Sequence, residues 1–239
     1  MHLHTVLSPC GSLEMSPRNI VQKSVDRGLD MIAVTDHNTT LHGPVLHRLA
    51  KDQGLSVLCG VEVTTREEVH CLAYFSSPEK LNEFDRLLYE RLADIPNEPD
   101  RFGYQVVVDE WDQILEQRGK LLISAVDMGV EQVERKVHEL GGLFVPAHID
   151  RMRNGIIAQL GFVPSGLRCD ALEVSRHSST QEMLARYPYL DGYTFLRGSD
   201  AHFPEDVGKG YTEFSVEALT WEEIRMAMHG LNQRKMEVR

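Results

Sequence analysis

The sequence predicts an α/β fold built on a parallel sheet or barrel, and three observations carry this prediction. Short apolar, β-like runs alternate with helix-like runs along the chain, as in folds where strands and helices follow one another around a parallel sheet. The 239 residues, 42% of them hydrophobic, suffice for one barrel-sized core. No internal repeat or low-complexity segment divides the chain. We therefore expect a single domain over residues 1–239.

The first third of the chain has the clearest boundaries. Ser16 as N-cap, Pro17 at the first helical position and Gly28 past the end delimit the first helix, and Gly54 ends the second. The apolar runs between these helices have the length of strands. We expect strands at His2–Leu7, Met31–Thr35, Ser56–Val63 and Cys71–Phe75, and helices at Pro17–Arg27 and Leu41–Gln53.

The pattern changes at about residues 78–119 and then resumes. This charged, amphipathic stretch around Ile95–Pro99 predicts a helical insertion that could cover a site as a lid, with helices at Lys80–Leu92 and Glu110–Gln117. The remaining strands are expected at Leu143–Ala147, Ala171–Val174 and Thr194–Arg197, and the remaining helices at Val130–Leu140, Ser179–Arg186 and Leu219–Gly230.

Composition excludes some functions. The formal net charge of −11 argues against binding of a long nucleic-acid duplex through a broad basic surface. No apolar run approaches the roughly 20 residues that cross a bilayer, no signal peptide is evident, and the four cysteines form no CxxC pair. These features predict a cytoplasmic protein that does not enter a membrane. Three of the cysteines lie in or beside apolar strands and are expected in the core: Cys59, Cys71 and Cys169.

Histidines and carboxylates lie at, or just past, the ends of the predicted strands. In a parallel barrel the carboxyl ends of the strands meet on one face, where active sites are built. His2 and His4 are two residues apart on a strand, so both imidazoles point to the same side and could share one ion. The residues at these strand ends are His2, His4, His37, Glu62, His70, His148, Asp200 and His202.

Glu62 stands inside an otherwise apolar strand. An unpaired charge buried there would cost several kcal/mol, so the residue calls for a metal ion or for a cationic partner such as Arg66. The other histidines, His42, His47 and His138, fall in helix patterns and are expected to be surface or structural residues.

The order of these motifs, HxH, then DH, then Glu, then two single His, then DxH, resembles the PHP family, named for polymerase and histidinol phosphatase domains. The match runs from His2 to His202. The resemblance implies a distorted (β/α)7, TIM-like barrel with two or three divalent metal ions that hydrolyses phosphoesters. It also implies three ligand sets: His2, His4, Glu62 and Asp200; then Glu62 again as a bridge, with His70 and His148; and His37 and His202 with one residue of the first loop.

The loop residue of that third set departs from the family pattern. Many relatives have Asp or His where this chain has Cys10. A thiolate ligand would favour zinc or iron over manganese, whereas a structural Cys10 would leave the third metal weak or absent. Asp36 is expected to hold His37 from outside the ligand set, with direct ligation left open.

The resemblance also assigns roles in catalysis. A hydroxide between the metals that share Glu62 is the expected nucleophile, and His202 or Asp200 could protonate the leaving oxygen. Three further residues follow strands on the same face and are expected to contact substrate: Arg151, Arg176 and His177. The guanidinium groups suit phosphate, although either could instead pair with Asp150 or Glu173.

These features predict a phosphoesterase acting on a small phosphomonoester or a short oligonucleotide, with zinc, iron or manganese as cofactor. Two alternatives remain open. An amidohydrolase-type metallohydrolase also uses HxH on its first strand, but no middle-strand lysine suited to carbamylation is evident. A non-catalytic, PHP-like binding protein would keep the site without turnover.

Overall fold

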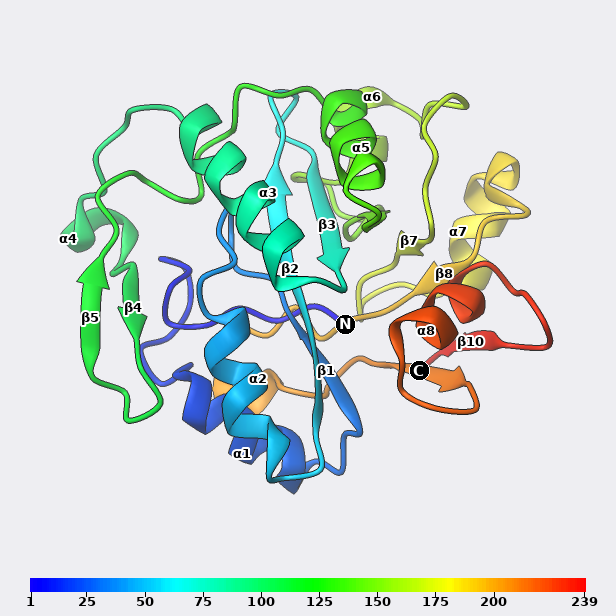
Figure 1. Ribbon diagram of the computed structural model, residues 1–239. Coiled ribbons are helices and arrows are strands. Elements are labelled where there is room, and N and C mark those ends of the chain that lie inside the picture. The colour runs from blue at the N-terminus through cyan, green and yellow to red at the C-terminus, as the bar shows by residue number, and fades with distance from the viewer.

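The computed structural model describes residues 1–239, and a four-stranded mixed sheet of order β1-β2-β3-β6 lies at its centre. β1 (Met31–Val34) and β2 (Ser56–Thr64) are parallel. β3 (His70–Phe75) is antiparallel to both β2 and β6 (Leu143–Pro146). Figure 1 shows helices α3 and α5 over the upper part of this sheet and α1 and α2 beside its lower part.

Three pairs of strands lie outside the central sheet. In Figure 1 the β4–β5 hairpin lies on the left, and β10 and α8 lie on the right. The pairs are parallel β7 (Leu172–Glu173) and β8 (Phe195–Leu196), antiparallel β4 (Val106–Val108) and β5 (Ile114–Gln117), and antiparallel β9 (Thr212–Ser215) and β10 (Lys235–Val238).

Single backbone contacts connect the central sheet to the β7–β8 pair. Ile149 N donates to Glu173 O at 2.9 Å, just past β6, and Thr35 N donates to Leu3 O at 3.0 Å, just past β1. Leu3 also forms a parallel bridge with Ala201. The segments therefore follow one another around a shared centre. The α/β class is confirmed, but the strand ladders form no closed barrel, so the (β/α)7 barrel stays a prediction.

Local capping explains why several helices begin where they do. Ser16 Oγ accepts a hydrogen bond from Asn19 N, and Ser179 and Glu182 form a reciprocal capping box. The helices are α1 (Pro17–Asp26), α2 (Gly43–Lys51), α3 (Pro78–Arg91), α4 (Pro99–Phe102), α5 (Val130–Glu139), α6 (Ile156–Leu160), α7 (Thr180–Arg186) and α8 (Trp221–Met228), with 3₁₀ turns at Pro188–Leu190 and Pro204–Asp206.

Most predicted elements are confirmed, with ends that shift by at most two residues. The predicted strand at His2–Leu7 is wrong, because only Leu3 forms a bridge there. The predicted helix at Glu110–Gln117 is also wrong. Asp109 Oδ1 accepts hydrogen bonds from the amides of Trp111 and Gln113, both at 2.9 Å, and this turn folds the segment into a hairpin instead.

The two faces of the sheet bury different clusters. On β3, Cys71 and Ala73 face α3 and α5, whereas Leu72 and Tyr74 pack with residues of α8, following the alternation of strand side chains. Cys71 is buried as expected, and Cys59 and Cys169 pack partly buried against the same cluster.

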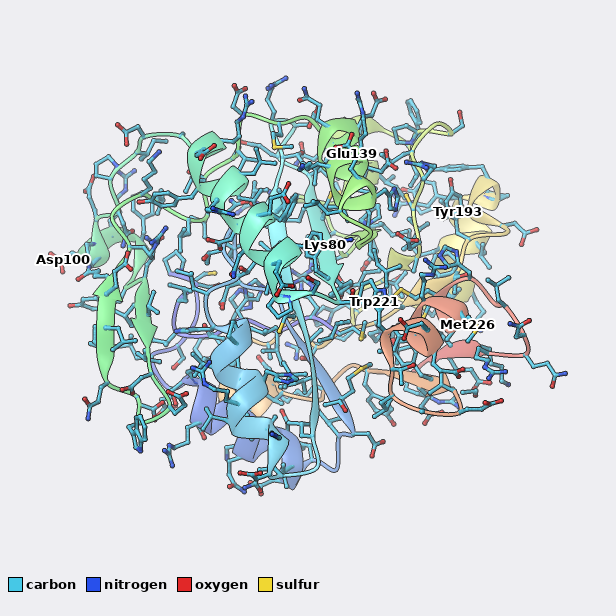
Figure 2. The ribbon with its side chains drawn as sticks, in the orientation of Figure 1. Lys80, Asp100, Glu139, Tyr193, Trp221 and Met226 are labelled. Atoms are coloured by element: carbon cyan, nitrogen blue, oxygen red, sulfur yellow. The ribbon has the colours of Figure 1, made fainter.

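The outward sides of the helices are polar. Lys80 on α3 and Glu139 on α5, both labelled in Figure 2, are exposed. No helix of the structure combines the length and the apolarity needed to cross a membrane.

Candidate metal centre

The predicted ligands converge on the carboxylate of Glu62, which is buried at the end of β2. Five imidazoles lie within 3.4 Å of its two oxygens. Oε1 lies 2.9 Å from His70 Nδ1, 3.1 Å from His148 Nε2 and 3.4 Å from His2 Nε2, and Oε2 lies 3.1 Å from His37 Nδ1 and 3.3 Å from His4 Nε2. No arginine pairs with this carboxylate, and Arg66 binds Asp127 on the surface instead.

Asp200 closes the other side of this cluster. Its Oδ1 lies 3.4 Å from His2 Nε2, 3.3 Å from His4 Nε2 and 3.6 Å from His202 Nδ1. Its Oδ2 pairs with the guanidinium of Arg151 at 2.6 Å. The carboxylate thus contacts both the histidines and a cation that reaches in from the loop after β6.

Strand geometry and backbone strain aim these side chains. His2 and His4 point into the centre, and Leu3 between them faces the opposite way into an apolar cluster with Ala201. His148 and Asp200 have positive φ angles of 29° and 47°, a conformation that costs energy for residues other than glycine and is often kept at functional sites.

Glu173 on β7 holds this arrangement from outside, and our sequence analysis gave it no such role. Its buried carboxylate binds His2 Nδ1 at 2.9 Å and accepts hydrogen bonds from the amides of His148 at 3.0 Å and Gly198 at 3.2 Å. A Cβ on Gly198 would lie 2.3 Å from His2 Cβ. The signal that could have identified Glu173 is the same as for Glu62, a charge inside an apolar strand.

Asp36 contacts the first loop and forms no hydrogen bond or ion pair with the ring of His37. Its carboxylate accepts hydrogen bonds from the hydroxyls of Thr5 at 2.8 Å and Ser8 at 2.7 Å. Ser8 Oγ in turn lies 3.0 Å from His4 Nδ1 and accepts from the backbone amide of His37 at 3.2 Å. The outer role predicted for Asp36 therefore reaches His37 only through Ser8.

Burial and charge shift the pKa values of the cluster in opposite directions. Burial lowers the pKa of His4, but hydrogen bonds to Asp200 and Glu62 outweigh it and raise the pKa to about 9. Burial disfavours the charge of Glu62, yet the imidazoles, His70 first, hold its pKa well below the ordinary value. Burial, with the charge of His4, lowers the pKa of His202 to about 4. Glu62 therefore stays ionised and available to a cation.

The donors form three groups that could each hold a metal ion, with ligand atoms within 4.8 Å of one another. Nδ1 of His37 lies 3.1 Å from Glu62, but the geometry is not that of a hydrogen bond, so this buried nitrogen has no hydrogen-bond partner. A metal ion bound to the nitrogen would supply the missing partner. Imidazole and carboxylate ligands suit zinc, iron and manganese. The three groups are His2, His4 and Glu62; His37, Glu62 and His70; and His4, His37 and His202.

Cys10 belongs to none of these groups, and His4 takes the place expected for it beside His37 and His202. The residue is exposed. Desolvation by nearby protein atoms, together with the charge of Glu62, nevertheless raises the pKa of its thiol to about 12. Ligation by Cys10 stays a prediction.

The residues predicted to contact substrate separate in space. Arg151 lines a cavity of about 500 Å³ over the metal groups and also a neighbouring groove of about 630 Å³. Met152 lines both spaces as well, and His177 lines the groove. Arg176 lines neither of them and pairs with Asp206 at 3.0 Å.

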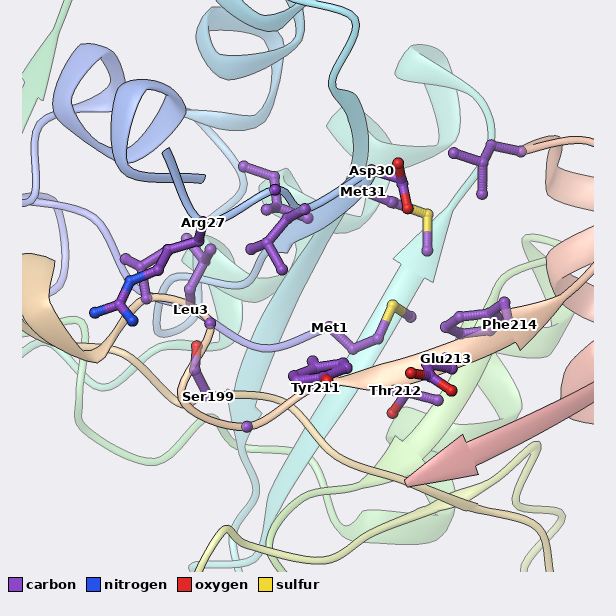
Figure 3. Close-up of a pocket in the computed structure, with 17 residues that line it drawn as sticks. Met1, Leu3, Arg27, Asp30, Met31, Ser199, Tyr211, Thr212, Glu213 and Phe214 are labelled. Atoms are coloured by element: carbon purple, nitrogen blue, oxygen red, sulfur yellow. The ribbon is translucent and has the colours of Figure 1, made fainter. Parts of the chain in front are cut away.

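Another cavity, of about 510 Å³, lies behind the centre and contains none of the candidate ligands. Figure 3 shows Leu3 and Ser199 at its wall, with Tyr211 and Phe214 from the region of β9. Leu3 and Ser199 alternate with His2, His4 and Asp200 along their segments, so this cavity lies on the face opposite to the ligands.

Comparison with known families agrees with this geometry. The model of the PHP domain matches residues 1–153, and a PHP-associated region matches residues 191–230. The chain belongs to the PHP domain family. An uncharacterised protein of Bacillus subtilis, YqxK, is 32% identical over 109 residues, which span 44% of this chain and 28% of that protein. The PHP chain therefore matches less than a third of this relative's length.

Solved structures share the fold at low sequence identity. The lesion-specific endonuclease EndoQ of Pyrococcus furiosus superimposes with a TM-score of 0.74 at 20% identity, over 99% of this chain and 56% of that chain. Endonuclease Q bound to a 27-mer duplex with an abasic lesion gives 0.74 at 19% identity, over 98% and 57%. A candidate metal-dependent phosphoesterase of Bifidobacterium adolescentis gives 0.59 at 21%, over 84% and 86%.

Proposed function

We propose that this chain is a metal-dependent phosphoesterase that hydrolyses a phosphomonoester or a short nucleotide substrate. The observation that carries the proposal is the convergence of five imidazoles on Glu62, with Arg151 beside them on Asp200. Two or three divalent ions there would neutralise phosphate oxygens and lower the pKa of a bound water, which supplies the attacking hydroxide.

The side chains divide the remaining tasks. Glu62 and the histidines hold and orient the ions, and Glu173 keeps His2 in place through its Nδ1. Arg151 presents a guanidinium to the phosphate at the wall of the cavity. Nearby histidines hold the pKa of Asp200 far below its usual range despite its burial. Asp200 is therefore a ligand without a proton to give. Burial lowers the pKa of His202 to about 4, so neither residue carries an acidic proton near pH 7, and protonation of the leaving oxygen by either of them stays a prediction.

The cavity and the groove share Arg151 and Met152 in their walls, and this arrangement suggests where substrate binds. The phosphate would occupy the cavity over the metal groups, and the rest of the substrate would extend past Arg151 and Met152 into the groove. The groove combines an apolar floor, including Ile157 and Met183, with the polar side chains of His177 and other residues. That mixture suits a small organic group with hydrogen-bonding atoms, such as a nucleoside.

The similarity to endonuclease Q supports a phosphodiester within a nucleic acid as one form of the substrate. The shared fold covers 56% of the endonuclease chain, and the net charge of −11 offers no broad basic surface for a duplex. Our expectation that a long duplex is not the substrate stays a prediction, and a short oligonucleotide remains the form that both observations favour.

The test measures hydrolysis of p-nitrophenyl phosphate and of bis(p-nitrophenyl) phosphate before and after removal of metal by a chelator. We expect activity that is lost with the chelator, restored by zinc, iron or manganese, and absent in Glu62→Gln. Glu116→Gln, a change of the same kind on the exposed strand β5, is the matched control and should retain full activity.

The same preparation separates the alternatives. Hydrolysis of cyclic amides without hydrolysis of either phosphate ester would favour an amidohydrolase-type enzyme. Stoichiometric metal without turnover of any ester or amide would favour a binding protein. Either result would overturn the proposed phosphoesterase.

A further inference from the structure

His42, at the start of α2, is a buried histidine that the mechanism above does not use. Both of its ring nitrogens have a partner. The backbone amide of Val108 donates to Nε2 at 2.9 Å, and Nδ1 lies 2.6 Å from the hydroxyl of Thr5. Because an amide N–H can only donate, Nε2 of the neutral ring carries no proton, and Nδ1 must be the donor to Thr5.

This protonation of His42 determines where the hydroxyl proton of Thr5 points. Thr5 Oγ1 accepts from His42 Nδ1, so its own proton goes to Asp36 Oδ2 at 2.8 Å. Asp36 Oδ1 accepts from the Ser8 hydroxyl at 2.7 Å. Once that hydroxyl proton is used, Ser8 Oγ can only accept from His4 Nδ1 at 3.0 Å. All of these side chains are buried, so water does not compete for their hydrogen bonds.

The chain of hydrogen bonds ends at a candidate metal ligand. When a metal ion displaces the proton on Nε2 of His4, the ring keeps only the proton on Nδ1, which points to Ser8. Nε2 is the atom that faces Glu62 at 3.3 Å and Asp200 at 3.3 Å. A histidine binds a metal through an unprotonated nitrogen, and the partner of its other nitrogen sets the tautomer and the ring orientation.

The other end of this series of hydrogen bonds lies in the β4–β5 hairpin. The strand register shifts between Val107 and Val108, at the residue whose amide goes to His42. Val106 and Val108 pack against Val6 in a small apolar cluster. Gly103, just before β4, approaches so closely that a Cβ would lie 2.0 Å from the carbonyl oxygen of Pro9. The hairpin therefore rests on the loop that carries Thr5 and Ser8.

We propose that His42 is a positioning residue that fixes the ring of His4 through Thr5, Asp36 and Ser8, and thereby couples the seating of the β4–β5 hairpin to metal binding. This inference rests on the proposed function only in that it requires metal at His4. It makes the hairpin amide of Val108 sensitive to metal bound at the other end of the chain.

Two variants of His42 each keep one of its two hydrogen bonds and remove the other. In His42→Gln the side-chain amide reaches the position of Nε2 and can still accept from Val108, but no donor faces Thr5. In His42→Asn the amide nitrogen lies near the position of Nδ1 and can still donate to Thr5, but the acceptor for Val108 is lost. His47→Gln, on the exposed side of the same helix, is the matched control.

Zinc titration of the metal-free protein is the first measurement. We expect His42→Gln to weaken zinc binding about tenfold, the lower end of the effect of outer partners of metal ligands. His42→Asn should weaken it less, because only the coupling to the Val108 amide is lost, and His47→Gln should bind within about twofold of the wild type. Thermal unfolding of the metal-free variants checks that the fold is retained.

Amide hydrogen exchange of Val108, followed by NMR, is the second measurement. Zinc should slow this exchange in the wild type, and it should not do so in His42→Asn, where the amide has lost its acceptor. These readings do not require catalysis. A wild type that binds zinc but hydrolyses no phosphate ester would refute the proposed function and leave this inference to be decided by the same data.

Thr5 provides a second pair of variants in case His42 variants unfold. Thr5→Val removes the hydroxyl at nearly constant shape and should weaken zinc binding, whereas Thr5→Ser keeps the hydroxyl and should restore it. Zinc affinity in His42→Gln or Thr5→Val equal to that of the wild type would overturn the proposal. So would zinc protection of Val108 that persists in His42→Asn.

Discussion

The strand ends that hold the metal groups and the loop after β6 lie side by side but are built differently. His2, His4 and Glu62 are buried and held by hydrogen bonds and ion pairs to neighbouring side chains. Past His148 the loop turns outward, and four residues beyond it Met152 is 82% exposed. Arg151 is the link, since it lines the cavity and pairs with Asp200. Metal binding is therefore preorganised, whereas substrate contact depends on side chains that the fold constrains less.

The largest effect inside the strand-end region is expected for Glu173→Gln. The change removes the charge that pairs with His2 but keeps nearly the same shape, and loss of an outer partner typically costs about 10- to 100-fold in metal affinity. Zinc titration checks this value. Glu182→Gln, an exposed change in α7, is the control, and unchanged affinity in Glu173→Gln would mean that His2 needs no outside support.

Arg151→Ala should act on substrate and leave the metal content unchanged. A charged hydrogen bond contributes about 1.5–3 kcal/mol, so kcat/KM should fall about 10- to 150-fold, with Arg151→Lys intermediate. Arg176→Ala is the matched control, because its guanidinium pairs with Asp206 away from the cavity. Loss of metal in Arg151→Ala would break the distinction between the two regions, since the arginine would then belong to the metal-holding part.

Met152→Ser should have a smaller effect that is confined to larger substrates. The side chain is exposed, so the free energy of unfolding should change by less than about 0.5 kcal/mol. The KM for a nucleotide that extends into the groove should rise, whereas the KM for p-nitrophenyl phosphate should not change. Equal changes for both substrates, measured by steady-state kinetics, would argue against the groove as the place of the substrate's remaining part.

The smallest effect is expected far from both regions, at His138. Hydrogen bonds to Asp170 and Glu134 raise its pKa above 6.5, with burial acting against them. A group with a raised folded-state pKa stabilises the protein fully below its unfolded pKa, and that contribution is lost as pH rises through the folded pKa. His138→Gln should therefore lower the free energy of unfolding most below pH 6.5. Denaturant unfolding at several pH values should show that the difference between wild type and variant becomes smaller as the pH rises. A difference independent of pH would contradict this.

Much of the candidate site was predictable because its signals are local. His37, His148 and Asp200 each follow an apolar run, whereas His70 stands at the start of one. The topology brings the ends of such runs together. Glu173 carries the same signal as Glu62 but lies on a strand of two residues, so its partner could not be inferred. His42 has no local signal at all, because its role depends on Val108, 66 residues away. The β4–β5 hairpin was not predicted because the residues after Asp109 favour a helix. The turn that forms instead depends on hydrogen bonds to the side chain of Asp109 alone.

Metal stoichiometry is the decisive measurement for the proposed metal centre. Protein dialysed after incubation with zinc, iron or manganese, and analysed by plasma mass spectrometry, should contain two or three equivalents of metal. Glu62→Gln should lose at least one of them, because this carboxylate belongs to two of the three groups, while Glu116→Gln should keep all. Wild-type protein that retains none of the three metals would contradict the account.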